Sequence, residues 1–337
     1  MKITIVTCVK NEGPFLLEWI AFNRMIGVTD FLFYSNDCTD GTSELLDKLS
    51  EHGVVQHLPN PGKEGQPYQM VALKHAPALP IVSNADWVFV TDVDEFLNIS
   101  IGNGTLPELI EECGNPQAIS ITMRMFANGG VADFVDEPVI SQFTKTHAPD
   151  LWGNERAIEV KTLTRNDFPL GHFGAHRPFI SRHHDLSNSP VKWSDGSGRQ
   201  VPYPFLTAAN KRRRHRFPAK GARALASLNH YTLRSLDSYL VKSARGDVNR
   251  KYRHFNIDYW MDRNADDVEE TSILKAQTKL EKEMEFLLDL PKIRELHDKT
   301  VTAHRQEHEM LLQSTDFQEL RDSLINVSPA LGSLGNS

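Results

Sequence analysis

The chain of 337 residues has little cysteine and no long apolar run. Its three cysteines, Cys8, Cys38 and Cys113, are too few and too widely spaced for a disulfide framework or a zinc cluster, so a reducing compartment fits best. No stretch approaches the roughly 20 apolar residues of a membrane-spanning helix. The apolar start, MKITIVTCV, ends at the polar segment KNEG (residues 10–13), which is too early for a signal peptide. We therefore expect a cytoplasmic protein.

Positive charge is also in short supply. The 37 Lys and Arg residues are outnumbered by 44 Asp and Glu residues, for a net charge of −7. Because nucleic-acid binding depends on basic surfaces, we expect no nucleic-acid partner. The exception is KRRRHR, from Lys211 to Arg216, which lacks the interleaved aromatic residues of a nucleic-acid patch. It is a solvated face or, as an alternative, a peripheral contact with the anionic inner face of the membrane.

Strand-like and helix-like segments alternate over about the first hundred residues. Apolar, β-branched runs predict strands at residues 3–7, 30–35, 53–58 and 86–92, with helical patterns between them. This alternation is typical of βαβ units with right-handed crossovers. Further on, a strand is predicted at 117–126, and a strand end at about 230 precedes a helix. The sequence therefore predicts an α/β fold with a mostly parallel sheet flanked by helices.

Three carboxylates follow the fourth predicted strand, in TDVDEF: Asp92, Asp94 and Glu95. Like charges repel, and burial of a carboxylate is costly without compensation. Two other polar segments, KNEG and SNDCTD, follow strands whose carboxyl ends should meet at the same edge of the sheet. If the backbone stays extended, Asp92 and Asp94 share a face and suit Mg²⁺ or Mn²⁺ bound with substrate phosphates. The alternative is that these acids cap a following helix or lie in solvent.

Two segments, TCVKNEGPFLLEWIAFNRMIGVTDFLFYSNDCTDGT and WVFVTDVDEFL, resemble glycosyltransferase family 2 proteins of the GT-A fold, in a branch related to family 92. The similarity covers residues 1–135 and resumes at LNHYTLRSLDSYLVKSARG. It implies a GT-A-like, Rossmann-like domain over residues 1–250, with a nucleotide-binding half at 1–115 and an acceptor and metal half at 116–250. Residues 251–337 would form a helical C-terminal extension with a disordered tail.

The resemblance also implies roles for individual residues. The implied nucleotide and diphosphate contacts are Thr7, Val9, Asn11, Glu12, Asn36, Asp40, Asp92, Lys242 and Arg245. Asn36 stands where the family usually has an aspartate that contacts the base, and its amide is both donor and acceptor. The implied metal ligands, for Mn²⁺ or Mg²⁺, are Asp92, Asp94 and His230. The sequence does not single out the catalytic base, for which Asp133, Asp136 and Glu155 are candidates.

These expectations describe a metal-dependent glycosyltransferase. It would move a sugar from a nucleotide-sugar donor, preferably a UDP-sugar, to a hydroxyl of a glycan or lipid-linked acceptor, with inversion, in polysaccharide or glycoconjugate synthesis. One alternative is a nucleotidyltransferase, which should carry a Gly-rich, basic loop after the first strand, where this chain has CVKNEGPF. The other is an inactive glycan- or membrane-binding protein, against which the intact Asp92, Asp94 and His230 argue.

Overall fold

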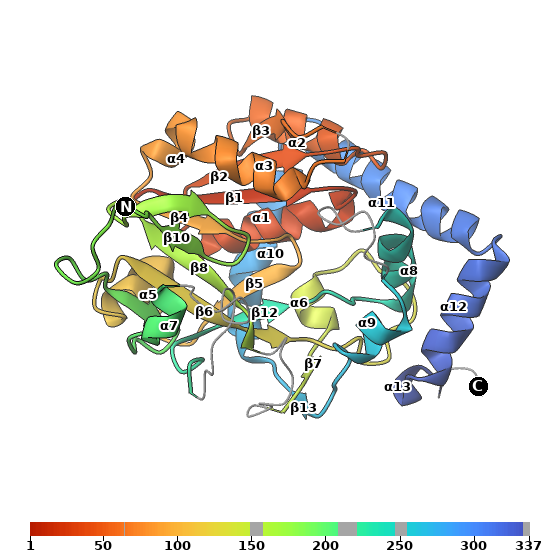
Figure 1. Cartoon of the computed structure of the whole chain (residues 1–337). Helices are drawn as coiled ribbons and strands as arrows, with labels where there is room; N and C mark the ends of the chain where they lie inside the picture. The colour runs from red at the N-terminus through yellow and green to blue at the C-terminus, as the bar shows by residue number, and fades with distance from the viewer. Residues whose placement is uncertain (64, 149–157, 208–220, 247–254, 333–337) are drawn as a thin grey trace.

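The computed structural model describes residues 1–63, 65–148, 158–207, 221–246 and 255–332. Within these residues a nine-stranded mixed sheet has the order β3-β2-β1-β4-β8-β6-β12-β5, with β11 also beside β6 (Figure 1). Its strands are β1 (Ile3–Val9), β2 (Asp30–Ser35), β3 (Gln56–Pro59), β4 (Trp87–Val90), β5 (Glu95–Ile99), β6 (Ala118–Met125), β8 (Val160–Arg165), β11 (Trp193–Asp195) and β12 (Ala226–His230). Two small antiparallel pairs lie apart from it: β9 (Leu170–Phe173) with β10 (Pro178–Ile180), and β7 (Lys145–Thr146) with β13 (Val268–Glu269).

Helices cover the sheet and extend beyond it. In the first half they are η1 (Gly13–Phe15), α1 (Leu16–Met25), α2 (Thr42–Glu51), α3 (Tyr68–His75), η2 (Ala76–Ala78), α4 (Pro80–Ser83) and α5 (Leu106–Glu112). In the second half they are α6 (Val139–Gln142), α7 (Tyr203–Leu206), α8 (Leu236–Arg245), α9 (Ile257–Met261), η5 (Ser272–Ala276), α10 (Gln277–Leu288), α11 (Ile293–Leu311), α12 (Thr315–Asn326) and α13 (Pro329–Gly332). The predicted α/β fold with a mostly parallel, helix-flanked sheet is thus confirmed.

Strand direction decides where a site forms. β1, β2, β3 and β4 run parallel to one another. β8 is antiparallel to both β4 and β6, so β4 and β6 point the same way, and β12 is parallel to β6. The carboxyl ends of β1, β2, β4, β6 and β12 therefore meet at one edge of the sheet, which is where open α/β sheets bind ligands.

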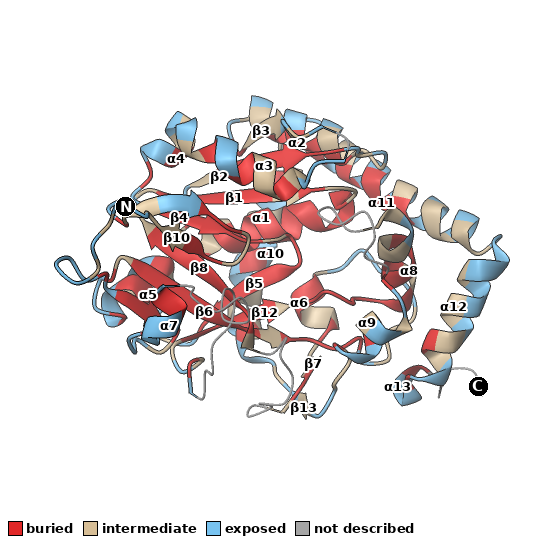
Figure 2. Ribbon diagram, viewed as in Figure 1, coloured by how far each residue is buried: buried red, intermediate tan, exposed pale blue. Residues whose placement is uncertain are grey.

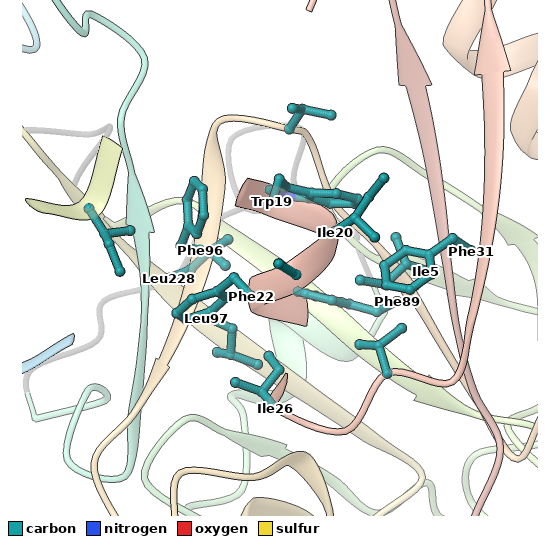
Figure 3. Packing of buried hydrophobic residues seen from close by; sticks show 14 of the residues in the cluster. Ile5, Trp19, Ile20, Phe22, Ile26, Phe31, Phe89, Phe96, Leu97 and Leu228 are labelled. Atoms are coloured by element: carbon teal, nitrogen blue, oxygen red, sulfur yellow. The ribbon is translucent and has the colours of Figure 1, made fainter. Parts of the chain in front are cut away.

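The two faces of the sheet are built by alternation along the strands. In β2, Phe31 and Phe33 face one apolar cluster, whereas Leu32 and Tyr34 face another. Figure 3 shows Trp19, Ile20 and Phe22 of α1 among side chains of the strands on the first face. In Figure 2 the sheet and α1 are largely buried, whereas much of α12 is intermediate or exposed.

The helices η5 and α10 and the start of α11 join this core. Ile273, Leu280, Leu287 and Ile293 belong to the same apolar cluster as α1 and β1. The predicted disordered tail is partly wrong, because Ser328 and Leu331 are buried and Pro329–Gly332 is helical. No helix in the described part of the chain is long and apolar enough to cross a membrane.

The acidic segment has neither the extended backbone that a shared face requires nor the following helix of the alternative interpretation. β4 ends at Val90 and the chain then turns, with the Glu95 N–H donating to the Asp92 carbonyl over 3.1 Å. The segment after the turn is the strand β5, paired antiparallel with β12, and not a helix. Asp92 and Asp94 are therefore not on one face of an extended strand.

Candidate functional site at the carboxyl edge of the sheet

Asp94 is paired with residues from the far end of the chain. Its Oδ1 lies 3.4 Å from Nε2 of His230, the last residue of β12, and its Oδ2 accepts from Nζ of Lys242 on α8 over 2.9 Å. The same ammonium donates to the carbonyl and hydroxyl of Thr232. Burial raises the pKa of Asp94, but Lys242 and His230 outweigh it and hold this pKa well below the usual carboxyl range. Asp94 is therefore an anion at neutral pH.

Asp92 faces a different lysine. Its Oδ2 accepts from Nζ of Lys161 on β8 over 2.8 Å, and its Oδ1 accepts from Nε2 of Gln69 on α3 over 3.2 Å. Lys161 also lies 3.4 Å from Oε2 of Glu95, whose side chain is fully buried. Burial lowers the pKa of Lys161, but Asp92 and Glu95 raise it above its usual value. The compensating charges of the acidic segment thus come from lysines on β8 and α8.

Glu12, at the end of the loop after β1, lies between two arginines. Its Oε2 accepts from Nη1 of Arg234 over 2.9 Å and its Oε1 accepts from Nη2 of Arg245. Arg245 also donates to the carbonyls of Lys10 and Asn11. Burial raises the pKa of Glu12, but Arg245 and Arg234 outweigh it and lower the pKa overall. This Arg–Glu–Arg triad joins the loop after β1 to the segment from β12 to α8.

The members of the triad and their neighbours have defined partners in this structure. Glu12 and Arg245 were predicted to contact nucleotide and diphosphate, but their charged groups bind each other and the loop backbone. The Asn11 amide donates to the Thr39 hydroxyl and accepts from the Thr39 backbone N–H, and Asp40 accepts from the backbone N–H groups of Gly13 and Thr42. In this structure these residues shape the two loops beside the site. Their direct contact with a nucleotide stays a prediction.

Buried polar atoms without partners lie at the ends of β1 and β2. The Thr7 Oγ1 and the Asn36 Oδ1 are buried and accept or donate no hydrogen bond within the described residues. A buried orphan of this kind is uncommon in a folded protein, and a ligand often supplies the missing partner. Val9 contributes its backbone carbonyl, which accepts from the Asn36 N–H over 3.2 Å. Val9 and Asn36 are therefore in contact at the carboxyl edge, whereas Thr7 lies two residues before the end of β1.

The predicted metal ligands are only partly assembled. Among the described residues, no three His, Cys, Asp or Glu side chains come close enough to enclose a metal ion. Asp94 and His230 do face each other, at a distance long for an N–H···O bond, and His230 Nδ1 is buried without a hydrogen-bond partner in the described part of the chain. A carboxylate oxygen and an imidazole nitrogen are donors that suit Mn²⁺. The pair fits two positions of a metal shell, whereas Asp92 is turned to Lys161.

The surroundings of the candidate bases do not single out one of them as the catalytic base. Asp133 is exposed, and both carboxylate oxygens of Asp136 lie 3.2 Å from Nε2 of His297 on α11. Glu155 lies outside the described residues, as does the basic run from Lys211 to Arg216.

Three site residues were missed from sequence: Gln69, Lys161 and Arg234. Arg234 has a positive φ of 56° and its guanidinium lies 3.5 Å from the centroid of the Phe15 ring. Its position four residues after His230, within the second matching segment, was a usable signal. The signal for Lys161 was weaker: it is a charged residue within the β-branched run VKTLT, which predicts a strand.

His304 on α11 gives the site region a pH-dependent stability. Burial, then Arg234 and Arg245, lower the pKa of His304 to about 3. An unfolded histidine has a pKa of about 6.5, so below that pH the folded state binds fewer protons and stability falls, by up to about 1.4 kcal/mol per pH unit. The variant His304→Gln should lose less stability than the wild type between about pH 7.5 and about pH 5 in urea unfolding. Equal losses would contradict this assignment.

Comparison with known proteins matches residues 3–167 to glycosyltransferase family 92. A family 92 protein of Oryza sativa subsp. japonica is 32% identical over 111 residues, which are 32% of this chain and 18% of that protein. One of Arabidopsis thaliana is 30% identical over 100 residues, 28% of this chain and 16% of that protein. The chain thus spans less than a fifth of either relative's length.

Two solved structures show looser similarity. The mannosyltransferase PcManGT of Pyrobaculum calidifontis, in complex with GDP-Man and Mn²⁺, is 13% identical with a TM-score of 0.36, covering 98% of this chain and 86% of that one. S. aureus TarS 1–349 with UDP-GlcNAc is 13% identical with a TM-score of 0.32, covering 93% and 92%. TM-scores this low carry no weight for function. The predicted relation to family 92 rests on the sequence match and is confirmed: residues 3–167 match the model of glycosyltransferase family 92.

Proposed function

We propose that the protein transfers a sugar from a nucleoside-diphosphate donor, preferably a UDP-sugar, to a hydroxyl acceptor with the help of a divalent cation. The observation that carries the proposal is the Asp94–His230 pair at the carboxyl edge of the sheet. Lys242 lies against Asp94 and Arg234 against Glu12, and among the described residues the Asn36 Oδ1 after β2 is buried without a hydrogen-bond partner. Base, diphosphate and metal would thus each meet matching chemistry along one edge.

Each residue has a defined part in this proposal. Asp94 and His230 would hold Mn²⁺ or Mg²⁺, which when bound withdraws charge from the departing diphosphate. Lys242 lies against Asp94 and adds a positive charge where the leaving group develops negative charge. The Asn36 amide would pair with the edge of the base, because its Oδ1 is buried without a hydrogen-bond partner among the described residues.

The reaction itself is attack by an acceptor hydroxyl on the anomeric carbon as the diphosphate leaves. We propose inversion, with Asp133, Asp136 or Glu155 removing the proton of the hydroxyl, and a glycan or lipid-linked acceptor. Attraction of the Lys211–Arg216 run to an anionic membrane surface belongs to the same proposal. The anomeric configuration of the product, read by NMR, tests the inversion.

A donor-hydrolysis screen tests the activity. Purified protein with Mn²⁺ is incubated with a panel of UDP-, GDP-, dTDP- and CMP-sugars, and released nucleotide is measured with and without EDTA. We expect metal-dependent release from at least one UDP-sugar. If no nucleotide sugar is hydrolysed and no nucleotide with Mn²⁺ raises the melting temperature, the proposed function is wrong.

A further inference from the structure

A cavity of about 200 Å³ lies between the C-terminal end of α1, β5 and the segment that runs from η5 into α10. Its walls include five apolar side chains that are each at most 4% exposed: Phe22, Ile26, Leu97, Ile99 and Ile273. Phe22, Ile26 and Leu97 lie together in Figure 3. The interior of the cavity is therefore apolar and closed off by the core of the protein.

The cavity lies at the opposite edge of the sheet from the Asp94–His230 pair. β5 and β12 are antiparallel, with Glu95 opposite His230 and Ile99 opposite Ala226. Because Glu95 follows Asp94 directly and Ile99 lines the cavity, the whole length of β5 separates the cavity from the pair. A ligand of this cavity is therefore not the nucleotide-sugar donor, and the inference does not rest on the proposed function.

Two lysines line the cavity where it reaches the surface. Lys275 and Lys279 are exposed, and neither forms an ion pair with a described residue. The Lys275 ammonium donates to the Ile99 carbonyl over 2.6 Å, which leaves further N–H groups for a ligand. Like charges four residues apart on a helical segment repel each other, so an anion between them is favourable. The mouth of the cavity thus suits a negatively charged group.

The neighbouring acids already have partners. Glu108 accepts from the backbone N–H groups of Asn103 and Thr105, and Glu283, four residues after Lys279, accepts from Arg24. These two negative charges beside the lysines make the surface mixed in charge, which disfavours an anionic membrane. Among the described residues, the large apolar side chains that are exposed do not line the cavity. The occupant is therefore a single molecule from solution.

We propose that this cavity binds a free aliphatic carboxylate, a fatty-acid-like ligand whose chain enters the apolar interior and whose carboxylate lies between Lys275 and Lys279. Removing each methylene of the chain from water favours binding by about fourfold. Ion pairs at exposed lysines contribute less than this over a whole chain. Chain length therefore sets the affinity, and the lysines set the orientation of the ligand.

Titration calorimetry of the full chain with decanoate and octanoate, each below the concentration at which it forms micelles, tests the proposal. We expect saturable binding of decanoate at one site. Octanoate should bind at least about tenfold more weakly, because it lacks two methylenes. Lys279→Gln should weaken decanoate binding about threefold, and Lys275→Gln combined with Lys279→Gln about tenfold.

A variant that fills the cavity tests the location of the chain. Ala276 also lines the cavity, so Ala276→Phe should place a ring inside it and abolish decanoate binding. Circular dichroism and the melting temperature show whether this variant folds. Methyl NMR of the wild type gives a second readout: decanoate should shift the signals of Ile26 and Ile273, but not that of Ile325 on α12.

The matched control is Lys282→Gln, which removes an exposed lysine of α10 that does not line the cavity. This variant should bind decanoate as tightly as the wild type. The proposal is overturned if decanoate shows no saturable binding, or if its affinity depends neither on chain length nor on Lys275 and Lys279. Sedimentation with phosphatidylglycerol vesicles is measured in parallel, and binding to vesicles without binding of decanoate would also overturn it.

Discussion

Replacing Glu12 by Gln is expected to lower the free energy of unfolding by about 3–5 kcal/mol, because it leaves two buried guanidinium groups without their counter-charge. Arg234 and Arg245 are both largely buried, and within the described ranges the Nε of each already lacks a hydrogen-bond partner. A glutamine keeps the shape and one acceptor but not the charge. Urea unfolding of the wild type and variant at neutral pH measures the difference.

The matched control is Glu44→Gln, which breaks the ion pair with Lys299 at a site where both side chains are more than half exposed. Exposed pairs contribute little, so this variant should stay within about 1 kcal/mol of the wild type. If Glu12→Gln is no more destabilising than Glu44→Gln, the triad does not join the two halves of the site in the way the contacts indicate.

The largest expected effect on activity comes from Asp94→Asn. An amide oxygen is a weaker metal ligand than a carboxylate, and it does not balance the charge of Lys242. We expect kcat/KM for transfer or donor hydrolysis to fall about a thousandfold, which is typical for loss of a group that stabilises developing charge. Steady-state kinetics over a range of Mn²⁺ concentrations measures this.

The control for that variant is Asp167→Asn, at an exposed carboxylate paired with Arg165 on β8. It should leave kcat/KM unchanged. The melting temperature of Asp94→Asn must also be compared with that of the wild type, since Lys242 loses an anionic partner. Full activity in a folded Asp94→Asn protein would rule out a metal role for this acid.

The sequence predicts the position of the site better than its contacts. Strand 30–35 is recovered with its bounds because aromatic and apolar residues are followed directly by a turn-rich segment. The common edge follows from parallel strand direction alone. Asp92 and Asp94 separate because Glu95 folds its carboxylate back onto the Asp92 N–H and turns the chain. A local pattern does not reveal that bond.

The basic partners of Glu12 and Asp92 cannot be predicted from the sequence for a different reason. Glu12 and Arg234 are 222 residues apart, and Asp92 and Lys161 are 69 apart. The order of the strands in the sheet brings such pairs together. β8 runs antiparallel to β4, and the sequence around β8 has only a weak periodic pattern, so its place in the sheet is not predicted. The sequence shows an excess of negative charge after β4, whereas only the fold shows which lysine meets which carboxylate.

The central claim is that Asp94 and His230 together bind a divalent cation with the nucleotide diphosphate. Pulsed electron paramagnetic resonance of Mn²⁺ bound with UDP tests it directly, because a coordinated imidazole nitrogen couples to the metal. We expect a histidine nitrogen coupling in the wild type that disappears in His230→Gln, whose fold is checked by circular dichroism. A spectrum without nitrogen coupling, or a coupling that persists in His230→Gln, would contradict it.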